Sequence, residues 1–172
     1  MILTTPTSEH IPQLRAFRLE FLDACAPSEG SGSLLRFDDP ADWLAHVARY
    51  ADPETVPPDR VPCSQYLYVR ESDGKIVGMI QIRHYLNEML EKYSGHIGYS
   101  VCPDERRKGY ATRMLAAALD KCREMGLTRV MISCRPDNEA SRRTILRNGG
   151  VYENTVWEPD RGRSLERYWI EL

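Results

Sequence analysis

Apolar residues recur at helical spacing in two segments of the first third of the chain. The first segment begins near Ser8, which we predict to be its N-cap. Its apolar positions are Ile11, Leu14, Phe17, Leu19 and Leu22. A second helix is predicted over 39–50, with a proline in its first turn. Residues 26–33 combine Pro, Gly and Ser, and residues 52–62 contain four prolines, so we expect both segments to be loops.

Strand patterns follow in the middle of the chain. Residues 65–70 and 75–83 flank the turn Ser72-Asp73-Gly74, which predicts a β-hairpin. Residues 85–93 are typical of a short helix or an ordered loop. Residues 96–101 then form an apolar strand pattern that leads directly into a basic loop.

The second half of the chain alternates helices and strands. A helix is predicted over 109–125, ending at a glycine, and a strand rich in β-branched residues over 128–134. Residues 138–148 form another capped helix, and two strands over 151–157 and 164–171 close the chain. This order, with helices as crossovers between strands, predicts an α/β fold with a mixed sheet.

Length and charge restrict the class of protein. A chain of 172 residues with 42% hydrophobic content predicts a single domain over 1–172. The formal net charge of −2 provides no general basic field, so we expect no nucleic-acid partner. A nucleic-acid module that uses the arginine clusters remains a third interpretation, and composition disfavours it.

Cysteine usage and the N-terminus indicate the compartment. The five cysteines include no Cys-x-x-Cys pair, which argues against a disulfide framework and a zinc site, and we expect no metal. Residues 1–10 lack a basic region followed by an apolar run, and no stretch approaches about 18 apolar residues. We therefore expect a cytoplasmic protein without a membrane partner.

The stretch from Val101 to Ala111 has the pattern of an anion site. An apolar strand leads into a basic loop with a glycine, and the loop opens a helix. The first N–H groups of a helix have no internal partners and lie at the positive end of its dipole, so a pyrophosphate is a suitable ligand. Gly109 allows close approach of the backbone, and Arg106, Arg107 and Lys108 add positive charge. The sequence therefore predicts a ligand with phosphate groups.

These residues resemble the GCN5-related N-acetyltransferase (GNAT) family, which binds acetyl-CoA at an Arg/Gln-x-x-Gly-x-Gly/Ala loop. Here the loop is Arg106-Arg107-Lys108-Gly109-Tyr110-Ala111. The context strengthens a short motif: a strand precedes it, a helix of the expected length follows, and the next strand leads to Asn138-x-x-Ser141 and Gly149-Gly150. The resemblance covers roughly residues 66–156.

The resemblance implies a fold and a cosubstrate site. The expected fold is one mixed, mostly antiparallel central sheet flanked by helices, with a splayed strand pair at the cofactor. Acetyl-CoA is the implied cosubstrate, its pantetheine arm pairing with the strand at Val101. The implied cofactor-binding residues are Val101, Cys102, Arg106, Arg107, Lys108, Gly109, Tyr110, Ala111, Thr112, Asn138 and Ser141. Asn138 alone also fits the simpler role of an N-cap.

The resemblance implies direct attack of a primary amine on the thioester, without a metal. Many relatives have a tyrosine seven residues after the asparagine as general acid, but that position here is Ile145. Possible substitutes are Tyr99, Ser100, Cys134 and Tyr152. For the base, His96 occupies the strand position where several relatives have a glutamate, and its ordinary pKa near 6.5 suits deprotonation of an ammonium. The further candidates for the base are Glu88 and His84.

Four points stay open in the sequence. The missing tyrosine favours, as an alternative to an enzyme, a CoA-binding sensor or regulatory domain without transferase activity. The acceptor is a small-molecule or peptide amine, and no charge pattern selects between them. The aromatic C-terminal strands allow a homodimer. Arg142 is placed to reach the adenosine phosphate, although a solvated surface is its default.

Overall fold

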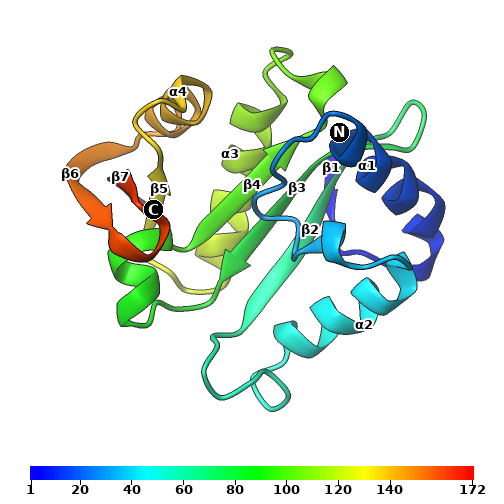
Figure 1. Ribbon diagram of the computed structural model, residues 1–172, viewed down its shortest axis with the longest axis horizontal. Helices are drawn as coiled ribbons and strands as arrows, with labels where there is room; N and C mark the ends of the chain where they lie inside the picture. The colour runs from blue at the N-terminus through cyan, green and yellow to red at the C-terminus, as the bar shows by residue number, and fades with distance from the viewer.

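The first sheet has four antiparallel strands in the order β1-β2-β3-β4 in the computed structural model, which describes all 172 residues (Figure 1). The strands are β1 (Ile2–Thr4), β2 (Cys63–Arg70), β3 (Lys75–Arg83) and β4 (Ile97–Val101). The register of β3 and β4 pairs Gly78 with Val101 and Ile82 with Ile97. This sheet confirms the predicted hairpin and makes β4 its edge strand.

The second sheet has three antiparallel strands in the order β5-β7-β6. They are β5 (Arg129–Cys134), β6 (Val151–Glu158) and β7 (Arg163–Glu171). The two sheets meet at an isolated bridge between Gly95 and Ile132, and no ladder continues from it between β4 and β5. The splayed pair and the mostly antiparallel α/β fold are thus confirmed. The single expected sheet takes the form of two separately hydrogen-bonded sheets, because their neighbouring edges separate beyond the bridge.

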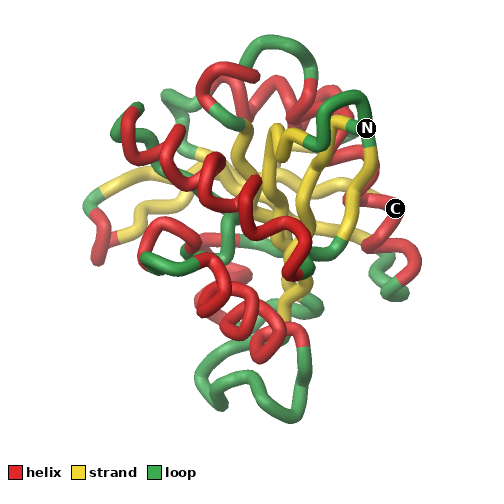
Figure 2. Tube along the Cα trace, turned by 90° about the vertical axis from the view of Figure 1, so that its right-hand side faces the viewer, coloured by secondary structure: helices red, strands yellow, loops and turns green.

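Helices cover both faces of the first sheet. The helices are α1 (Ile11–Asp23), α2 (Pro40–Ala51), α3 (Tyr110–Glu124) and α4 (Glu139–Arg147). Phe17 and Phe21 of α1 and Trp43 of α2 pack on Met79 in one buried cluster. Figure 2 views the molecule from that side, with α1 and α2 in front of the strands. Residues of α3 and α4 pack in a second, larger cluster that includes Val101 of β4.

Most local predictions agree with these bounds to within one or two residues. Ser8 is not the N-cap, because the first helix opens with a 3₁₀ turn over Ser8–His10 and Thr7 precedes it. The backbone N–H of Thr7 donates to Nδ1 of His10 at 3.1 Å. The ambiguous segment 85–93 forms a π-helical turn over Leu90–Ser94. No helix is long and apolar enough to cross a membrane.

The loop between α1 and α2 lies directly against β4. Gly30 has a φ of +71°, and a Cβ built on it would lie 1.9 Å from the carbonyl oxygen of Gly98. From the strand side, a Cβ on Gly98 would lie 3.3 Å from the backbone of Gly30. Only a glycine permits this approach at position 30. The loop therefore reaches the middle of β4, which is one of the two splayed strands.

Candidate active site

The loop before α3 presents unpaired backbone amides. Arg107 and Gly109 have φ angles of +62° and +76°, in the left-handed region, and Gly109 is the residue before the first turn of the helix. None of the six backbone N–H groups from Arg107 to Thr112 donates a hydrogen bond within the protein. Helix N-terminal amides of this kind bind anions. The predicted phosphate loop is therefore an exposed array of donors at the positive end of a 15-residue helix.

A buried carboxylate supports this loop from below. Glu105 is 5% exposed, and both of its carboxylate oxygens lie 3.1 Å from Nη1 of Arg70. Lys108 donates to Glu105 at 2.8 Å, and Lys75 lies 3.5 Å away. The pKa of Glu105 is lowered mainly by the Lys108 hydrogen bond. No local pattern indicates this role of Glu105, because Arg70, which contacts both of its oxygens, precedes it by 35 residues in the β2–β3 hairpin.

The same contacts change the role expected for Lys108. Its ammonium is hydrogen-bonded to Glu105, and Lys75 extends the cluster to Glu20 of α1 at 2.9 Å. Arg106 and Arg107 are exposed and make no ion pair. Neither arginine has a carboxylate partner, but only Arg107 is without a side-chain contact, because the guanidinium of Arg106 lies over Phe21 and donates to the backbone.

The free edge of β4 begins next to the loop. The N–H of Cys102 donates to Val77 of β3, and in an antiparallel ladder alternate residues point their backbone groups to opposite sides. The backbone groups of Val101 and Tyr99 consequently point away from β3, toward the splay. Nε of Arg106 donates to the carbonyl of Val101 at 3.3 Å. Arg106 thus occupies the carbonyl of Val101, and the other backbone groups on this edge agree with the predicted place of a pantetheine arm.

The start of α4 lies across the splay. Asn138 is its N-cap and accepts from the N–H of Ser141 at 3.2 Å. The hydroxyl of Tyr99 lies 2.9 Å from Oγ of Ser141, joining β4 to α4. Burial raises the pKa of Tyr99 to about 12, so its hydroxyl stays protonated. Ile145 is fully buried and supplies no polar group there.

The other substitutes for the missing acid lie in less suitable surroundings. Burial raises the pKa of the Cys134 thiol to about 11, and Oγ of Ser100 is buried without a hydrogen bond. Tyr152 is exposed on β6, and its hydroxyl is bonded to Thr155.

Cys102, a predicted cofactor-binding residue, has a fully buried side chain. Its thiol donates to the carbonyl of Ile76, and burial raises its pKa. Its backbone N–H and carbonyl are also bonded within the protein, to Val77 and Glu105, so Cys102 offers no unpaired group to a ligand.

His96 lies where the two sheets meet. Its backbone N–H donates to the carbonyl of Met131 at 2.7 Å, and its Nδ1 accepts from the N–H of the same residue at 3.0 Å. The ring proton is therefore on Nε2. Burial and the charges of Arg83 and Arg129 lower the pKa of His96 to about 4. In this arrangement His96 is a neutral hydrogen-bond donor.

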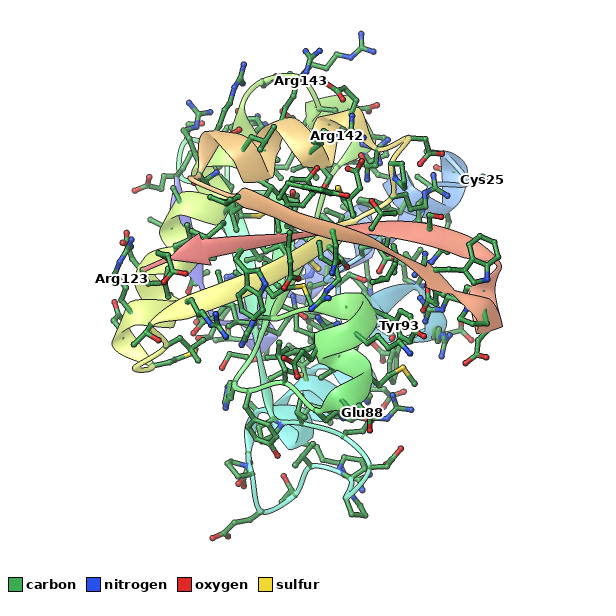
Figure 3. The ribbon with its side chains drawn as sticks, turned by 90° about the vertical axis from the view of Figure 1, so that its left-hand side faces the viewer. Cys25, Glu88, Tyr93, Arg123, Arg142 and Arg143 are labelled. Atoms are coloured by element: carbon green, nitrogen blue, oxygen red, sulfur yellow. The ribbon has the colours of Figure 1, made fainter.

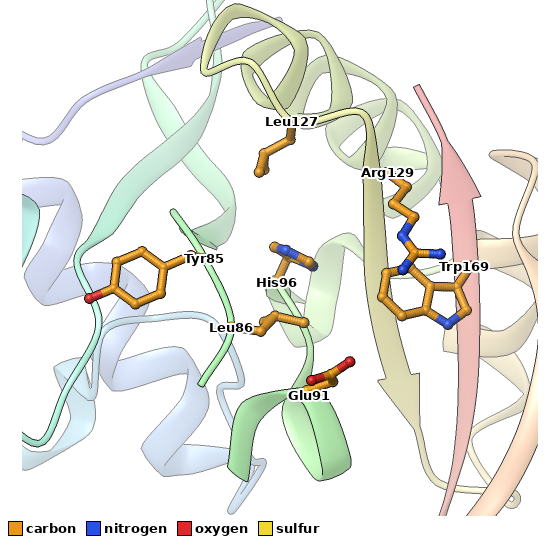
Figure 4. Close-up of a pocket in the computed structure, with 7 residues that line it drawn as sticks. All are labelled: Tyr85, Leu86, Glu91, His96, Leu127, Arg129 and Trp169. Carbon is orange, nitrogen blue, oxygen red and sulfur yellow. The ribbon is translucent and has the colours of Figure 1, made fainter. Parts of the chain in front are cut away.

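Two separate pockets contain the predicted bases. A pocket of about 290 Å³ lies beside His96 and is also lined by Tyr85, Leu86, Glu91, Leu127, Arg129 and Trp169 (Figure 4). A second pocket, of about 430 Å³, is lined by Asn87, Glu88, Met89, Lys92, Tyr93 and Asp160. Glu88 is exposed on the segment before β4, on the side opposite Arg142 and Arg143 in Figure 3. The structure does not bring His96 and Glu88 into one pocket.

Arg142 has partners within the protein. Its guanidinium donates to both carboxylate oxygens of Glu166 at 2.9 Å, and to Glu139 at 2.9 Å. These bonds raise its pKa. The expectation that Arg142 reaches a phosphate is therefore not supported, because its side chain is bonded to Glu166 of β7. No local sequence pattern indicates this contact, since Glu166 follows Arg142 by 24 residues. The structure contains no cluster of three or more His, Cys, Asp or Glu that would hold a metal.

Comparison with known proteins agrees with this geometry. The solved structure of a ribosomal-protein-S5-alanine acetyltransferase from Vibrio fischeri matches with a TM-score of 0.75 at 18% identity, over 98% of this chain and 91% of that chain. RimJ from Mycobacterium smegmatis, in complex with CoA-disulfide, matches with a TM-score of 0.72 at 21% identity, over 98% and 80%. A mutant form of spermidine N-acetyltransferase SpeG from Vibrio cholerae matches with a TM-score of 0.66 at 13% identity, over 99% and 95%. A search of curated proteins finds no match.

The fold and the site define an acyltransferase that uses acetyl-CoA. A model of the acetyltransferase (GNAT) family matches residues 33–149, and the chain belongs to that family. The resemblance found in the sequence is thereby confirmed, and N-acetyl transfer to an amine is favoured over a sensor without activity.

Proposed function

We propose that residues 106–112 bind the pyrophosphate of acetyl-CoA in a cytoplasmic, single-domain N-acetyltransferase. The six unpaired N–H groups from Arg107 to Thr112 support this assignment most directly. They are donors at a helix N-terminus, flanked by the guanidinium groups of Arg106 and Arg107, neither of which forms an ion pair. The backbone of Val101 would pair with the pantetheine arm, and Asn138 and Ser141 would border it from α4.

The chemistry supplied by acetyl-CoA is a thioester open to attack by an amine. The residues of this chain orient it between β4 and α4. We propose that Tyr99 donates a hydrogen bond to the leaving sulfur in place of the tyrosine absent at Ile145. Its protonated hydroxyl is the one among the four candidates that spans the space between β4 and α4. His96 and Glu88 stay predicted catalytic residues, with the neutral His96 suited to donate a hydrogen bond from Nε2 rather than to accept a proton.

Amine-dependent release of CoA thiol from acetyl-CoA tests the function. The acceptors would be peptides, polyamines, amino acids and aminoglycosides, at several pH values, with acetyl-CoA binding measured in the same samples. Turnover above the no-amine background is expected. Binding without turnover across the panel would instead favour the sensor domain.

Substitutions at two tyrosines test the assignment of the donor. Tyr99→Phe should lower kcat at least ~10-fold with little change in the Kd of acetyl-CoA. Tyr152→Phe removes a hydroxyl from an exposed position on β6 and is the matched control. Equal activity of Tyr99→Phe and the wild type would contradict this role.

A further inference from the structure

The pocket beside His96 contains polar groups that lack partners. The imidazole is 7% exposed, and while Nδ1 accepts from Met131, Nε2–H has no acceptor in the protein. His96 is also a lining residue of the pocket, so this donor faces the cavity (Figure 4). Nε2 is not among the fully buried polar atoms that lack a partner, so it is reachable from the pocket, where a ligand with an acceptor oxygen would take its hydrogen bond.

Two guanidinium groups lie close to this donor without a carboxylate partner. Arg129 forms no ion pair, and its guanidinium lies 4.2 Å from the ring centroid of Trp169. Arg83 is half-buried and forms no ion pair, and its guanidinium donates to the carbonyl of Gly95 at 2.8 Å. Desolvation by burial lowers the pKa of Arg83. Other arginines with half-buried side chains here bond to acids, as Arg70 and Arg142 do. Arg83 is therefore the one half-buried guanidinium without an acid partner, and the exposed Arg129 adds a second unpaired cation to the lining of the pocket.

The walls of the pocket are apolar and aromatic. Leu86, Leu127, Tyr85 and Trp169 provide them, and Glu91 is the one acid in the lining. Glu91 forms no ion pair with Arg129, although both line the same cavity. The cavity is thus an open pocket with apolar walls, one neutral donor and a planar cationic fork, which matches the geometry of a carboxylate.

We propose that this pocket binds a carboxylate of the acceptor, so that the substrate class is an amine that also has a carboxylate, as in a free amino acid. The inference rests on the proposed function in one respect, because His96 immediately precedes β4, the strand proposed to bind acetyl-CoA. Nε2–H of His96 and the guanidinium of Arg129 bind the carboxylate oxygens. Arg83 adds positive charge from β3, and Trp169 holds Arg129 in place by cation–π contact.

Binding without turnover tests the pocket independently of the enzyme activity. Phenylacetate and its neutral isostere phenylacetamide would be titrated into ¹⁵N-labelled protein, and the ring nitrogens of His96 and the indole N–H of Trp169 followed by NMR. Phenylacetate should shift both sets of resonances, and phenylacetamide should bind at least ~10-fold more weakly. Equal effects of the two probes, or no shift from either, would overturn the proposal.

Matched variants and inorganic phosphate sharpen the result. Arg129→Gln should weaken phenylacetate binding at least ~10-fold. Arg147→Gln, which removes an exposed guanidinium from α4, should leave it unchanged. Phosphate that binds as tightly as phenylacetate would overturn the assignment of a carboxylate, since the site would then be a general anion site.

Acetyl transfer to matched amines tests the acceptor class itself. Phenylalanine and lysine would be compared with phenylalaninamide and cadaverine, which lack the carboxylate. A kcat/KM at least ~10-fold higher for the carboxylated partners is expected in the wild type and should be lost in Arg129→Gln. Equal rates would refute the acceptor class and leave the N-acetyltransferase activity established. Failure of all amines with intact probe binding would contradict only the proposed function.

Discussion

The loop before α3 and the pocket beside His96 both present polar groups without protein partners, but the groups differ in kind. The loop offers backbone N–H groups over 107–112, held by the anchor at Glu105. The pocket offers the side chains of His96 and Arg129 on a junction of two sheets. A site made of backbone depends on conformation and tolerates many side chains. A site made of side chains depends on their identity, so substitutions should affect the two regions differently.

The largest effect is expected at His96, as a change of stability with pH. Its folded-state pKa of about 4 lies below the ordinary value of about 6.5, so the unfolded chain binds the proton more strongly. The stabilisation is complete above about pH 6.5 and is lost as the pH falls through about 4, which amounts to about 3 kcal/mol. His96→Gln should lose this dependence, since a glutamine is neutral at every pH.

Chemical denaturation at several pH values measures this change. The difference in free energy of unfolding between the wild type and His96→Gln should shrink by about 3 kcal/mol between about pH 7 and about pH 4. His10→Gln is the matched control. The imidazole of His10 is half-buried in the 3₁₀ turn before α1, and His10 is far in sequence from Arg83 and Arg129. A constant difference would show that His96 titrates normally.

The next effect is expected at the anchor of the loop. Glu105→Gln leaves Arg70 and Lys108 without their shared carboxylate, and about 2 kcal/mol of stability should be lost. Since the pKa of Glu105 is lowered by folding, its stabilisation is present above about pH 4.3 and is lost as the pH falls through the folded-state value. The backbone amides lose their support as well, so the Kd of CoA should rise about 10-fold.

Calorimetric titration with CoA and thermal unfolding measure the two consequences. Glu124→Gln breaks an exposed ion pair with Lys121 at the other end of α3 and should change neither quantity measurably. A wild-type Kd in Glu105→Gln would mean that the loop holds its conformation without the anchor.

A smaller effect separates the two ends of α3. Gly109 and Gly126 both have left-handed φ angles, +76° and +81°, and a Cβ at either would meet nothing within 4 Å. Alanine at either position should cost about 1 kcal/mol in stability from backbone strain alone. Only Gly109→Ala should also weaken CoA binding, several-fold, because only that glycine lies among the free amides. Equal CoA affinities of the two variants would contradict the backbone site.

The smallest expected effect is a gain in stability. Arg107 has a φ of +62° in spite of its side chain, and its guanidinium makes no ion pair. Arg107→Gly relieves this strain, partly offset by the greater freedom of glycine when unfolded, for a net gain of up to about 1 kcal/mol. Thermal unfolding would show a Tm higher by a few degrees. A lower Tm would mean that the arginine makes favourable contacts that outweigh the strain.

The same contrast explains which features the sequence alone could predict. The phosphate loop, the cap at Asn138 and the helix end at Gly126 each depend on neighbours within a few residues, and all three were predicted. The anchor at Glu105 depends on Arg70, 35 residues earlier, and no local pattern indicates it.

His96 shows the same limit more sharply. Its residue type suggested a base, but its protonation follows from Met131, 35 residues later, which supplies the N–H to Nδ1. The side-chain bonds of Arg142 depend likewise on Glu166 of a later strand. Such roles follow from which strands and helices become neighbours, and a single sequence does not specify those neighbours by spacing.

The contact between Gly30 and Gly98 has a consequence for engineering. Transplanting the α1–α2 loop from a relative, a common way to alter which acceptor an enzyme takes, would bring any side chain at position 30 into the carbonyl of β4. A graft would therefore need to keep a glycine at that point of the inserted loop, whatever else it changes. Libraries that randomise residues 26–33 should hold position 30 fixed, since most of their members would otherwise displace the strand that borders the active site.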